Sequence, residues 1–410
     1  MKILILLFAI TFSSLFSQNW KESTPLPAGT ETRNHPITFS IGKYGYYLTG
    51  YGITENVLKD FYRFDSETEE WEQLPDFPGL ERGFAYGVAY EGKAYVGFGL
   101  WFQGQSGAYL NDLWEYDPET EEWTQLESCP CEGRRHPALV AANGKVFVGM
   151  GDNQQSGNMN DWWEYNIETN TWKQQTNLPS LPRHHPYYFE IGDDVYVGLG
   201  HGTARDESNN FIYKSWFKWD TNEDIWTQMN DFPAEGRVAG TQFSHQNKGY
   251  VLSGQGVDHN NFDEGEFFQY DPEEDSWLML ESHPGNSSRW APGSFVIADT
   301  VYFTSGRSLF SPVVEHADLW KFTLPNNFAS VGEDESLFSF YPNPTKDFIN
   351  LNLENRNISK IEISNVKGDV VYTTNTFTNR IDISNYSEGA YFISIYSDNK
   401  SDTKKFIVKR

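Results

Sequence analysis

The sequence predicts an all-β chain, in which a six-bladed β-propeller closed by its N-terminal strand is followed by a small β-sandwich domain. Three observations predict this: a six-fold internal repeat, a composition rich in aromatic residues and glycine, and a last repeat that lacks one strand. The 410 residues include 14 Trp, 23 Tyr, 30 Phe and 34 Gly. Such a mixture suits short strands joined by tight turns. A core assembled from repeats also suits a chain too long for one ordinary core.

The repeat is marked by a tryptophan that is followed seven residues later by a proline. Successive tryptophans are 51, 52, 49, 54 and 51 residues apart, close to the ~40–50 residues of a propeller blade. We interpret them as structural residues that fill the gaps between neighbouring blades. They are Trp20, Trp71, Trp123, Trp172, Trp226 and Trp277.

Each repeat carries signals for four strands. An arginine follows the proline, and after an apolar stretch a second strand ends in two glycines split by one residue, as in Gly97-Phe98-Gly99. An alternating aromatic strand and the tryptophan strand complete the unit. Glycine at a strand end allows backbones to approach closely around the central channel. The arginine recurs in every repeat, so we expect a structural role in pairing with acids or carbonyls: Arg33, Arg82, Arg134, Arg183, Arg237 and Arg289.

The sixth repeat is incomplete. It runs from Arg289 to Phe322 without a following tryptophan strand, and a matching strand stands at the other end, around Trp20. We expect the N-terminal strand to complete the last blade. Closure of this kind leaves no exposed sheet edge, which is an aggregation hazard.

The motifs Tyr95-Val96-Gly97-Phe98-Gly99 and Tyr116-Asp117-Pro118 through Trp123 resemble the Kelch-repeat family, over roughly residues 19–324. One departure is that the two glycines are separated by a residue instead of adjacent. The resemblance implies the propeller fold. It leaves function open, because the family includes scaffolds, peptide binders, sugar mutarotases and a copper oxidase. The oxidase needs a Cys–Tyr crosslink, whereas both cysteines here lie two residues apart.

The two ends of the chain indicate export. Residues 1–17 are typical of a signal peptide, with Lys2, an apolar run too short to span a bilayer, and small residues before a cleavage point. A permanent anchor is the alternative. Residues 18–324 form the predicted propeller, 325–336 a linker and 337–410 a second domain.

This second domain resembles the C-terminal sorting domain (type A) of the type IX secretion system. The matching residues are Tyr341-Pro342-Asn343-Pro344, Glu388-Gly389-Ala390-Tyr391 and Lys405-Phe406-Ile407-Val408-Lys409. The resemblance implies that residues 337–410 engage the type IX secretion machinery. The protein would then be attached to the outer membrane at the cell surface or secreted. An accessory sandwich that binds a ligand is the alternative.

The net charge of −26 argues against nucleic acid and anionic membranes as partners. No segment after the signal peptide is apolar enough to cross a membrane, and we expect a monomer. The two cysteines, Cys129 and Cys131, are expected to be unpaired thiols. Together with His136 they could be imagined as a metal site, but a zinc site needs further ligands. No catalytic motif stands out, so we expect no metal, no cofactor and no catalytic residue.

The loops that precede the first strand suggest a ligand site. Three of them share Arg-x-His-Pro, which places His35, His136 and His185 at equivalent positions. A residue that varies between equivalent positions of the repeats is better suited to bind a ligand than to build the fold. The neighbouring Arg135 would add hydrogen-bond donors to such a site. A ligand should then bind more tightly below the histidine pKa of ~6.5. Packing of each histidine against the following proline is the alternative.

The loops between the second and third strands should open on the same face and vary in length, as functional loops do. They supply the remaining candidates: Trp101, Tyr109, His201, Arg205 and Asp206. We therefore predict an exported binding protein that presents this face to an extracellular glycan or protein. The alternative is a sugar-acting enzyme such as a mutarotase or epimerase, for which Arg205, Asp206 and Glu207 are the first suspects. A purely structural surface protein is a third interpretation.

Overall fold

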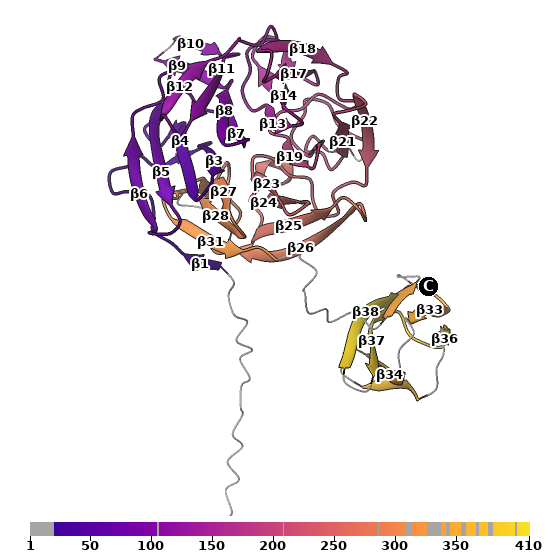
Figure 1. Cartoon of the computed structure of the whole chain (residues 1–410). Helices are drawn as coiled ribbons and strands as arrows, with labels where there is room; N and C mark the ends of the chain where they lie inside the picture. Colours follow the sequence, from indigo (N-terminus) through magenta and orange to yellow (C-terminus); the bar gives the residue numbers. More distant parts are fainter. Residues whose placement is uncertain are drawn as a thin grey trace, which may run out of the picture. The chain divides into compact units, whose positions relative to one another are not determined.

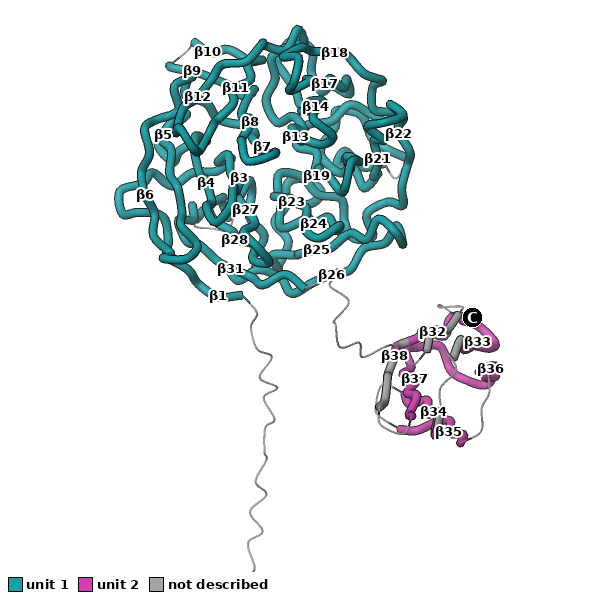
Figure 2. The backbone as a smooth tube through the Cα atoms, in the orientation of Figure 1, with its two compact units in different colours: residues 1–325 teal, residues 326–410 magenta. Residues whose placement is uncertain are grey.

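The computed structural model describes residues 20–325 and 338–410, apart from residues 105, 208, 286, 309–312, 342–344, 354–357, 366–368, 376–379 and 398–399 (Figure 1). The chain divides into two compact units, residues 1–325 and 326–410 (Figure 2). The predicted signal peptide lies outside the described residues, as does the predicted linker except for Pro325.

The first unit is a β-propeller in which each repeat folds into its own antiparallel sheet around a central channel (Figure 1). Within residues 20–325 the only helical element described is a short 3-10 turn, η1 (Val257–His259). The first sheet contains β2 (Arg33–Asn34), β3 (Ile37–Ile41), β4 (Tyr44–Gly52), β5 (Val57–Asp65) and β6 (Glu70–Leu74), and the second contains β7 (Tyr86–Tyr90), β8 (Lys93–Gly97), β11 (Leu113–Asp117) and β12 (Glu122–Gln125). The third contains β13 (Ala138–Ala142), β14 (Lys145–Gly149), β17 (Trp162–Asn166) and β18 (Thr171–Gln175), and the fourth contains β19 (Tyr187–Ile191), β20 (Asp194–Gly198), β21 (Trp216–Asp220) and β22 (Ile225–Met229). The fifth contains β23 (Thr241–His245), β24 (Lys248–Leu252), β25 (Gly265–Asp271) and β26 (Ser276–His283).

The last sheet combines the two ends of this unit. It consists of β27 (Gly293–Ile297), β28 (Thr300–Thr304), β31 (Leu319–Thr323) and the N-terminal strand β1 (Trp20–Glu22). In the register Trp20 faces Phe322. The indole of Trp20 is buried, and its Nε1 donates a hydrogen bond to the carbonyl of Glu281, 3.1 Å away in β26. This tryptophan therefore holds its own sheet and contacts the preceding one.

The repeated arginines lie inside the propeller and hold each loop to its sheet. All six are buried. Arg134 donates from Nη1 to the carbonyl of Met150, the residue between two split glycines, at 3.0 Å, and its guanidinium pairs with both oxygens of Asp161 at 2.5 and 2.8 Å. Arg82 and Arg289 repeat this pattern with Asp112 and Asp318. The predicted structural role of the arginine is confirmed.

One glycine of each split pair is required by the backbone: it is the second at Gly99, Gly151 and Gly200, and the first at Gly254. Gly99 has a φ of +92°, and a Cβ there would lie 2.6 Å from the carbonyl oxygen of Gly83. Its N–H donates to the carbonyl of Arg134 in the next repeat at 2.8 Å, and Gly306 makes the corresponding bond to Arg33 at 3.1 Å. Only a residue without a side chain fits this close crossing of loops.

The second unit contains two sheets with a common core. One has the order β32 (Phe338–Tyr341), β33 (Phe348–Leu353) and β36 (Arg380–Asp382); the other has β35 (Val370–Thr374), β34 (Ile358–Asn365), β37 (Gly389–Ser397) and β38 (Lys400–Val408). Buried side chains of both sheets form one apolar cluster that includes Ile349, Ile381, Ile363 and Ile393. Shared burial of this kind is how two packed sheets form a sandwich.

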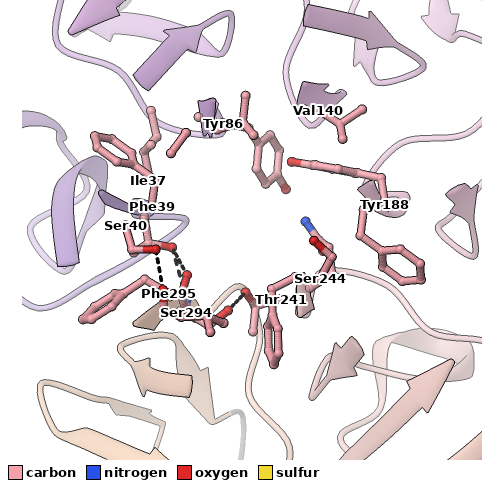
Figure 3. Close-up of a pocket in the computed structure, with 18 of the residues that line it drawn as sticks. Ile37, Phe39, Ser40, Tyr86, Val140, Tyr188, Thr241, Ser244, Ser294 and Phe295 are labelled. Atoms are coloured by element: carbon pink, nitrogen blue, oxygen red, sulfur yellow. Dashed lines mark hydrogen bonds between the residues drawn. The ribbon is translucent and has the colours of Figure 1, made fainter. Parts of the chain in front are cut away.

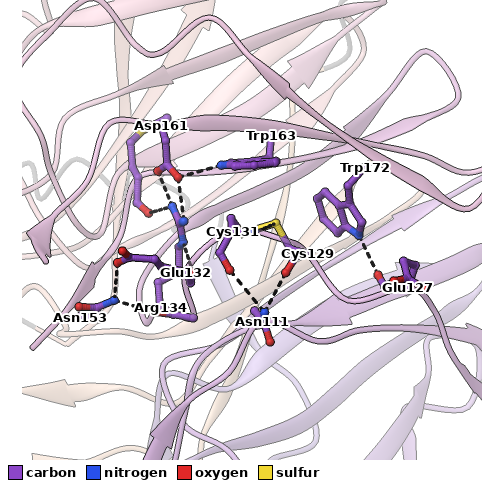
Figure 4. The surroundings of a disulfide bond; sticks show 12 residues. Asn111, Glu127, Cys129, Cys131, Glu132, Arg134, Asn153, Asp161, Trp163 and Trp172 are labelled. Carbon is purple, nitrogen blue, oxygen red and sulfur yellow. Dashed lines mark hydrogen bonds and ion pairs between the residues drawn. A yellow bond between two sulfur atoms is a disulfide. The ribbon is translucent and has the colours of Figure 1, made fainter. Parts of the chain in front are cut away.

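The expectation of two free thiols is wrong. Cys129 and Cys131 form a disulfide, with their Cα atoms 5.1 Å apart (Figure 4). That separation lies within the ordinary span of a disulfide, so one intervening proline leaves enough room. The amide of Asn111 donates to the Cys129 carbonyl at 2.8 Å, which fixes the loop that carries the bridge.

No helix among the described residues has the length and apolar character needed to span a bilayer.

Candidate ligand site on the loop face

The loops that precede the first strand lie beside the loops that follow the second strand. Isolated antiparallel bridges join Arg135 to Asp152, His184 to His201 and Trp290 to Arg307. Both sets of loops therefore open on one side of the propeller, which we call the loop face. The hairpins β9 (Leu100–Gln103) with β10 (Ser106–Tyr109), β15 (Asp152–Asn153) with β16 (Gly157–Asn158), and β29 (Arg307–Ser308) with β30 (Val314–Glu315) belong to it.

The first strands are preceded by one position per repeat with an unusual backbone conformation, which we call the slot. It is occupied by His35, Phe84, His136, His185, Ala239 and Ala291, whose φ angles lie between +46° and +61°. Backbone hydrogen bonds link successive slots, as from the His136 N–H to the Phe84 carbonyl at 2.9 Å and from the His185 N–H to the His136 carbonyl at 3.1 Å. The slot side chains are thus held close together around the channel.

The structure brings the three predicted slot histidines into contact. Nε2 of His35 lies 2.8 Å from Nε2 of His185. The rings of His136 and His185 stack with their centroids 3.5 Å apart. All three are buried, with at most 6% of the surface exposed. Phe84 packs edge-on against His35 and His136, which seals this cluster on one side.

Burial keeps these histidines neutral. It lowers the pKa of His35 to about 3, with the charges of Arg135 and Arg307 adding to the effect. It lowers the pKa of His136 and of His185 well below the ordinary value, and the neighbouring imidazoles contribute. The expected titration near pH 6.5 is therefore wrong for the slot histidines, because burial disfavours the charged imidazolium.

A line of histidines leads from the slot cluster to the surface. His184 follows His136 with ring centroids 5.7 Å apart, His201 follows His184 at 5.0 Å, and His259 follows His201 at 4.9 Å. Together with the slot histidines these make six of the nine histidines in the chain. Sequence reasoning did not select His184 and His259. The double histidine in Arg183-His184-His185-Pro186 was the available signal for the first of them.

The outer end of this line opens into a hollow of about 110 Å³. We call it the outer hollow. The guanidinium of Arg205 lies 4.4 Å from the centre of the Phe211 ring. The carboxylate of Asp206 accepts a hydrogen bond from the Asn210 N–H at 2.8 Å, which braces the loop. Side chains that line the hollow include His201, Arg205, Asn210, Phe211, Asp258 and His259. The arrangement offers a cation, an aromatic face, two imidazoles and the Asp258 carboxylate to one small polar group.

The remaining predicted residues are less well placed for a common ligand. Arg135 is held by Asp152, with Nη2 and Oδ2 3.0 Å apart, so its donors already have an acceptor. Trp101 and Tyr109 lie on the β9–β10 hairpin, where Trp101 faces Ala108. In the part of the chain that the structure describes, neither ring contacts the histidine line.

A second cavity of about 310 Å³ lies in the central channel, between the first strands of the sheets (Figure 3). The side chains of Tyr86 and Tyr188 point into it (Figure 3). Glu190 also lines it and accepts a hydrogen bond from the Ser244 hydroxyl at 2.7 Å. Burial raises the pKa of Glu190. Sequence reasoning named none of these residues, because they lie on strands whose pattern predicted only packing.

Two family models match the chain. The description of the first is Attractin/LZTR1 beta-propeller, and it matches residues 45–310. The chain belongs to the Attractin/LZTR1 beta-propeller family. This confirms the predicted Kelch-type propeller. The second model, a secretion system C-terminal sorting domain, matches residues 339–409 of this Attractin/LZTR1-type chain. The predicted sorting domain is therefore confirmed, and the protein is exported, to be attached at the cell surface or secreted.

Three similar proteins carry the name N-acetylneuraminate epimerase. The chain is 29% identical over 159 residues to the N-acetylneuraminate epimerase of Yersinia enterocolitica, covering 36% of this chain and 38% of the relative. It is 29% identical to that of Pasteurella multocida, covering 37% and 39%, and 32% identical to that of Escherichia coli K12, covering 23% and 26%. The chain thus spans less than two fifths of the length of these curated relatives.

The fold also matches a solved structure, described as "Structure of YjhT". The TM-score is 0.60 at 15% identity, over 74% of this chain and 98% of the other. At this identity the likeness shows the propeller fold alone.

Proposed function

We propose that this Attractin/LZTR1-type propeller is an exported carbohydrate-binding protein that takes an acidic sugar on its loop face. The observation that carries the proposal is the outer hollow, where Arg205, the Phe211 ring and two imidazoles meet. Aromatic faces stack against the CH faces of sugars, and a guanidinium pairs with a carboxylate. The names of the relatives support an acidic sugar, since N-acetylneuraminate carries a carboxylate.

The local charge supports an anionic ligand as well. In the fourth repeat Ser215 occupies the position of the acid that pairs with arginine in most other repeats. Arg183 donates to the hydroxyls of Ser180 and Ser215 instead, at 2.6 and 3.1 Å. Because the buried Arg183 guanidinium has no carboxylate at this position, this part of the loop face is more positive than the corresponding parts of the repeats that have an acid there. The outer hollow is lined partly by the same repeat, through His201, Arg205 and Phe211, and partly by the fifth repeat.

A glycan array with the purified full-length protein tests the proposal. We expect sialylated or other acidic glycans among the ligands, and weaker binding by Arg205→Ala. A control variant, Arg63→Ala, removes an arginine that pairs with Glu72 and Glu121 away from the loop face and should bind as the wild type does. Binding confined to neutral glycans, or unchanged in Arg205→Ala, would contradict the proposal.

A second candidate is an enzyme that interconverts the anomers of such a sugar. The observation that favours it is the pair His201 and His259, whose rings are 4.9 Å apart in the outer hollow. Burial lowers the pKa of both, so that one neutral imidazole could remove a proton while a neighbouring group returns one. Proton-exchange NMR of N-acetylneuraminate with the protein decides: faster anomer exchange indicates the enzyme, and binding without it indicates the binding protein.

We further propose that the propeller has six blades and that β1 closes the ring. The pairing of Trp20 with Phe322 and the bond from Gly306 to Arg33 support this. Trp20→Ala should cost about 3–5 kcal/mol of unfolding free energy, as for other buried tryptophans. An unchanged melting temperature would contradict closure by this strand.

The boundaries of the export signals are also a proposal: a signal peptide at 1–17, a linker at 325–336 and a sorting domain at 337–410 that takes no part in ligand binding. A chain truncated after Leu324 should keep its propeller folded but remain in the periplasm. Normal surface display of this truncated chain would overturn the assignment.

A further inference from the structure

The slot histidines form a cluster that packing alone does not explain. One ring nitrogen from each of His35, His136 and His185 lies within 4.8 Å of the other two. Imidazoles are polar, and burying three of them together without water is costly unless each nitrogen has a partner. Nε2 of His136 and Nδ1 of His185 have none among the described residues. Two buried ring nitrogens of the cluster are therefore left without a hydrogen-bond partner.

The outer nitrogens fix the tautomers of two rings. Nδ1 of His35 lies 2.6 Å from Oδ1 of Asn34, and Nδ1 of His136 lies 3.2 Å from Oδ1 of Asp152. Both partners are acceptors, so each Nδ1 carries the proton and each Nε2 presents a lone pair inward. An imidazole whose far nitrogen donates to a carboxylate or carbonyl is the usual form of a histidine metal ligand.

We propose that His35, His136 and His185 bind a transition-metal ion of the kind that prefers imidazole, such as Zn²⁺ or copper, at the centre of the propeller. Three neutral imidazoles with no oxygen ligand suit these ions and not Mg²⁺ or Ca²⁺. Binding requires the proton of His185 to lie on Nδ1, so that its Nε2 also faces the ion. The acidic partners Asp152 and Glu315, which pair with Arg135 and Arg307, offset the charge of those arginines near the site.

One pair of the proposed ligand atoms already lies close to the spacing that a metal site needs. Two nitrogens bound to one zinc ion at ~2.0–2.1 Å in a tetrahedral site are about 3.3 Å apart. Nε2 of His35 and Nε2 of His185 are 2.8 Å apart, the distance of a direct hydrogen bond. An ion would replace that bond and separate these two atoms by about half an ångström.

The proposal is tested by metal binding to the full-length protein, prepared without a polyhistidine tag and stripped with a chelator. Zn²⁺ and Cu²⁺ serve as probes, with Ca²⁺ and Mg²⁺ for comparison, and calorimetry and elemental analysis as readouts. We expect about one tightly bound Zn²⁺ or Cu²⁺ per chain. His185→Gln should weaken binding more than 100-fold and Asp152→Asn by about 10–100-fold. His245→Gln, which removes a histidine paired with Asp299 away from the cluster, should bind as the wild type does.

X-ray absorption of the zinc-loaded wild type gives a readout that does not depend on any variant. It should show imidazole nitrogens at about 2.0 Å. A shell of oxygens only would overturn the proposal, even if His185→Gln failed to fold. Equal affinity of the protein for Zn²⁺ and Mg²⁺ would also overturn the proposal. So would a Zn²⁺ affinity that is unchanged in both variants, Asp152→Asn and His185→Gln, when both are folded.

Discussion

The buried arginines and the slot residues stand two positions apart in the same six loops, yet they behave differently. The arginine is present in every repeat and is buried each time. The slot has the same left-handed backbone in every repeat but holds three histidines, one phenylalanine and two alanines. The arginine side chain therefore belongs to the frame, and the slot side chain is free to vary. Within one loop, the arginine contacts that recur in every repeat build the fold, while the slot position, which varies, is available for function.

The largest effect should come from removing a frame arginine. Arg134→Ala removes the ion-pair partner of Asp161 and the guanidinium that donates to the Met150 carbonyl. We expect a loss of about 3 kcal/mol of unfolding free energy, as for other broken buried pairs. Lys173→Ala, which removes the exposed partner of Asp224, should cost less than about 1 kcal/mol. Denaturant titration measures the unfolding free energy of both variants. Equal losses in the two would contradict the distinction between the buried arginines and the surface ion pairs.

The acids that pair with the frame arginines should make stability depend on pH. Burial raises the pKa of Asp112, but the hydrogen bonds and charge of Arg82 outweigh it, and the pKa lies below its ordinary value. Its contribution to stability is then complete above the unfolded pKa of ~3.9 and is lost as pH falls through the lower folded value. Asp112→Asn should cost about 2 kcal/mol at pH 7 and less at pH 3, where the contribution has begun to be lost. A pH-independent cost, measured by denaturant midpoints at both values, would contradict the pairing.

The fourth repeat allows the reverse experiment. Burial lowers the pKa of Arg183 to about 10, and Ser215 stands where most repeats have an acid. Ser215→Asp should restore the ion pair and raise the unfolding free energy by about 1 kcal/mol at pH 7. If the local positive charge serves an anionic ligand, the same variant should bind that ligand more weakly. A gain in both stability and affinity would argue against the charge assignment.

The smallest effect on stability is expected at the outer hollow. Arg205 is exposed and stacks on Phe211. Arg205→Ala should change the unfolding free energy by less than about 0.5 kcal/mol, as surface substitutions usually do. A large loss of stability would place Arg205 in the frame.

The sequence predicted the frame better than the site. The period of Trp71 and Trp123, the split glycines and the repeated arginine predicted the propeller because each reports a local requirement met in every repeat. The sequence also predicted that His35, His136 and His185 occupy equivalent positions. It could not predict that His184, His201 and His259 continue the line, because they come from three loops of two neighbouring repeats and meet only in the folded propeller.

The errors have physical causes as well. The low pKa of His136 follows from burial that no local pattern reports. The bond between Cys129 and Cys131 depends on a loop conformation that brings their Cα atoms to 5.1 Å. The channel residues Tyr86 and Glu190 were missed because a strand that lines a channel has the same residue pattern as one that packs in a core.

The central claim is that the loop face carries function while the frame carries stability. The most direct test is the calorimetric affinity of Arg205→Ala for N-acetylneuraminate, measured at a temperature where the variant and the wild type are equally folded. The account predicts binding by the wild type and an affinity at least about tenfold weaker in the variant, as expected when a charged hydrogen bond is lost. Equal affinities, or no binding of any acidic sugar by the folded wild type, would contradict it.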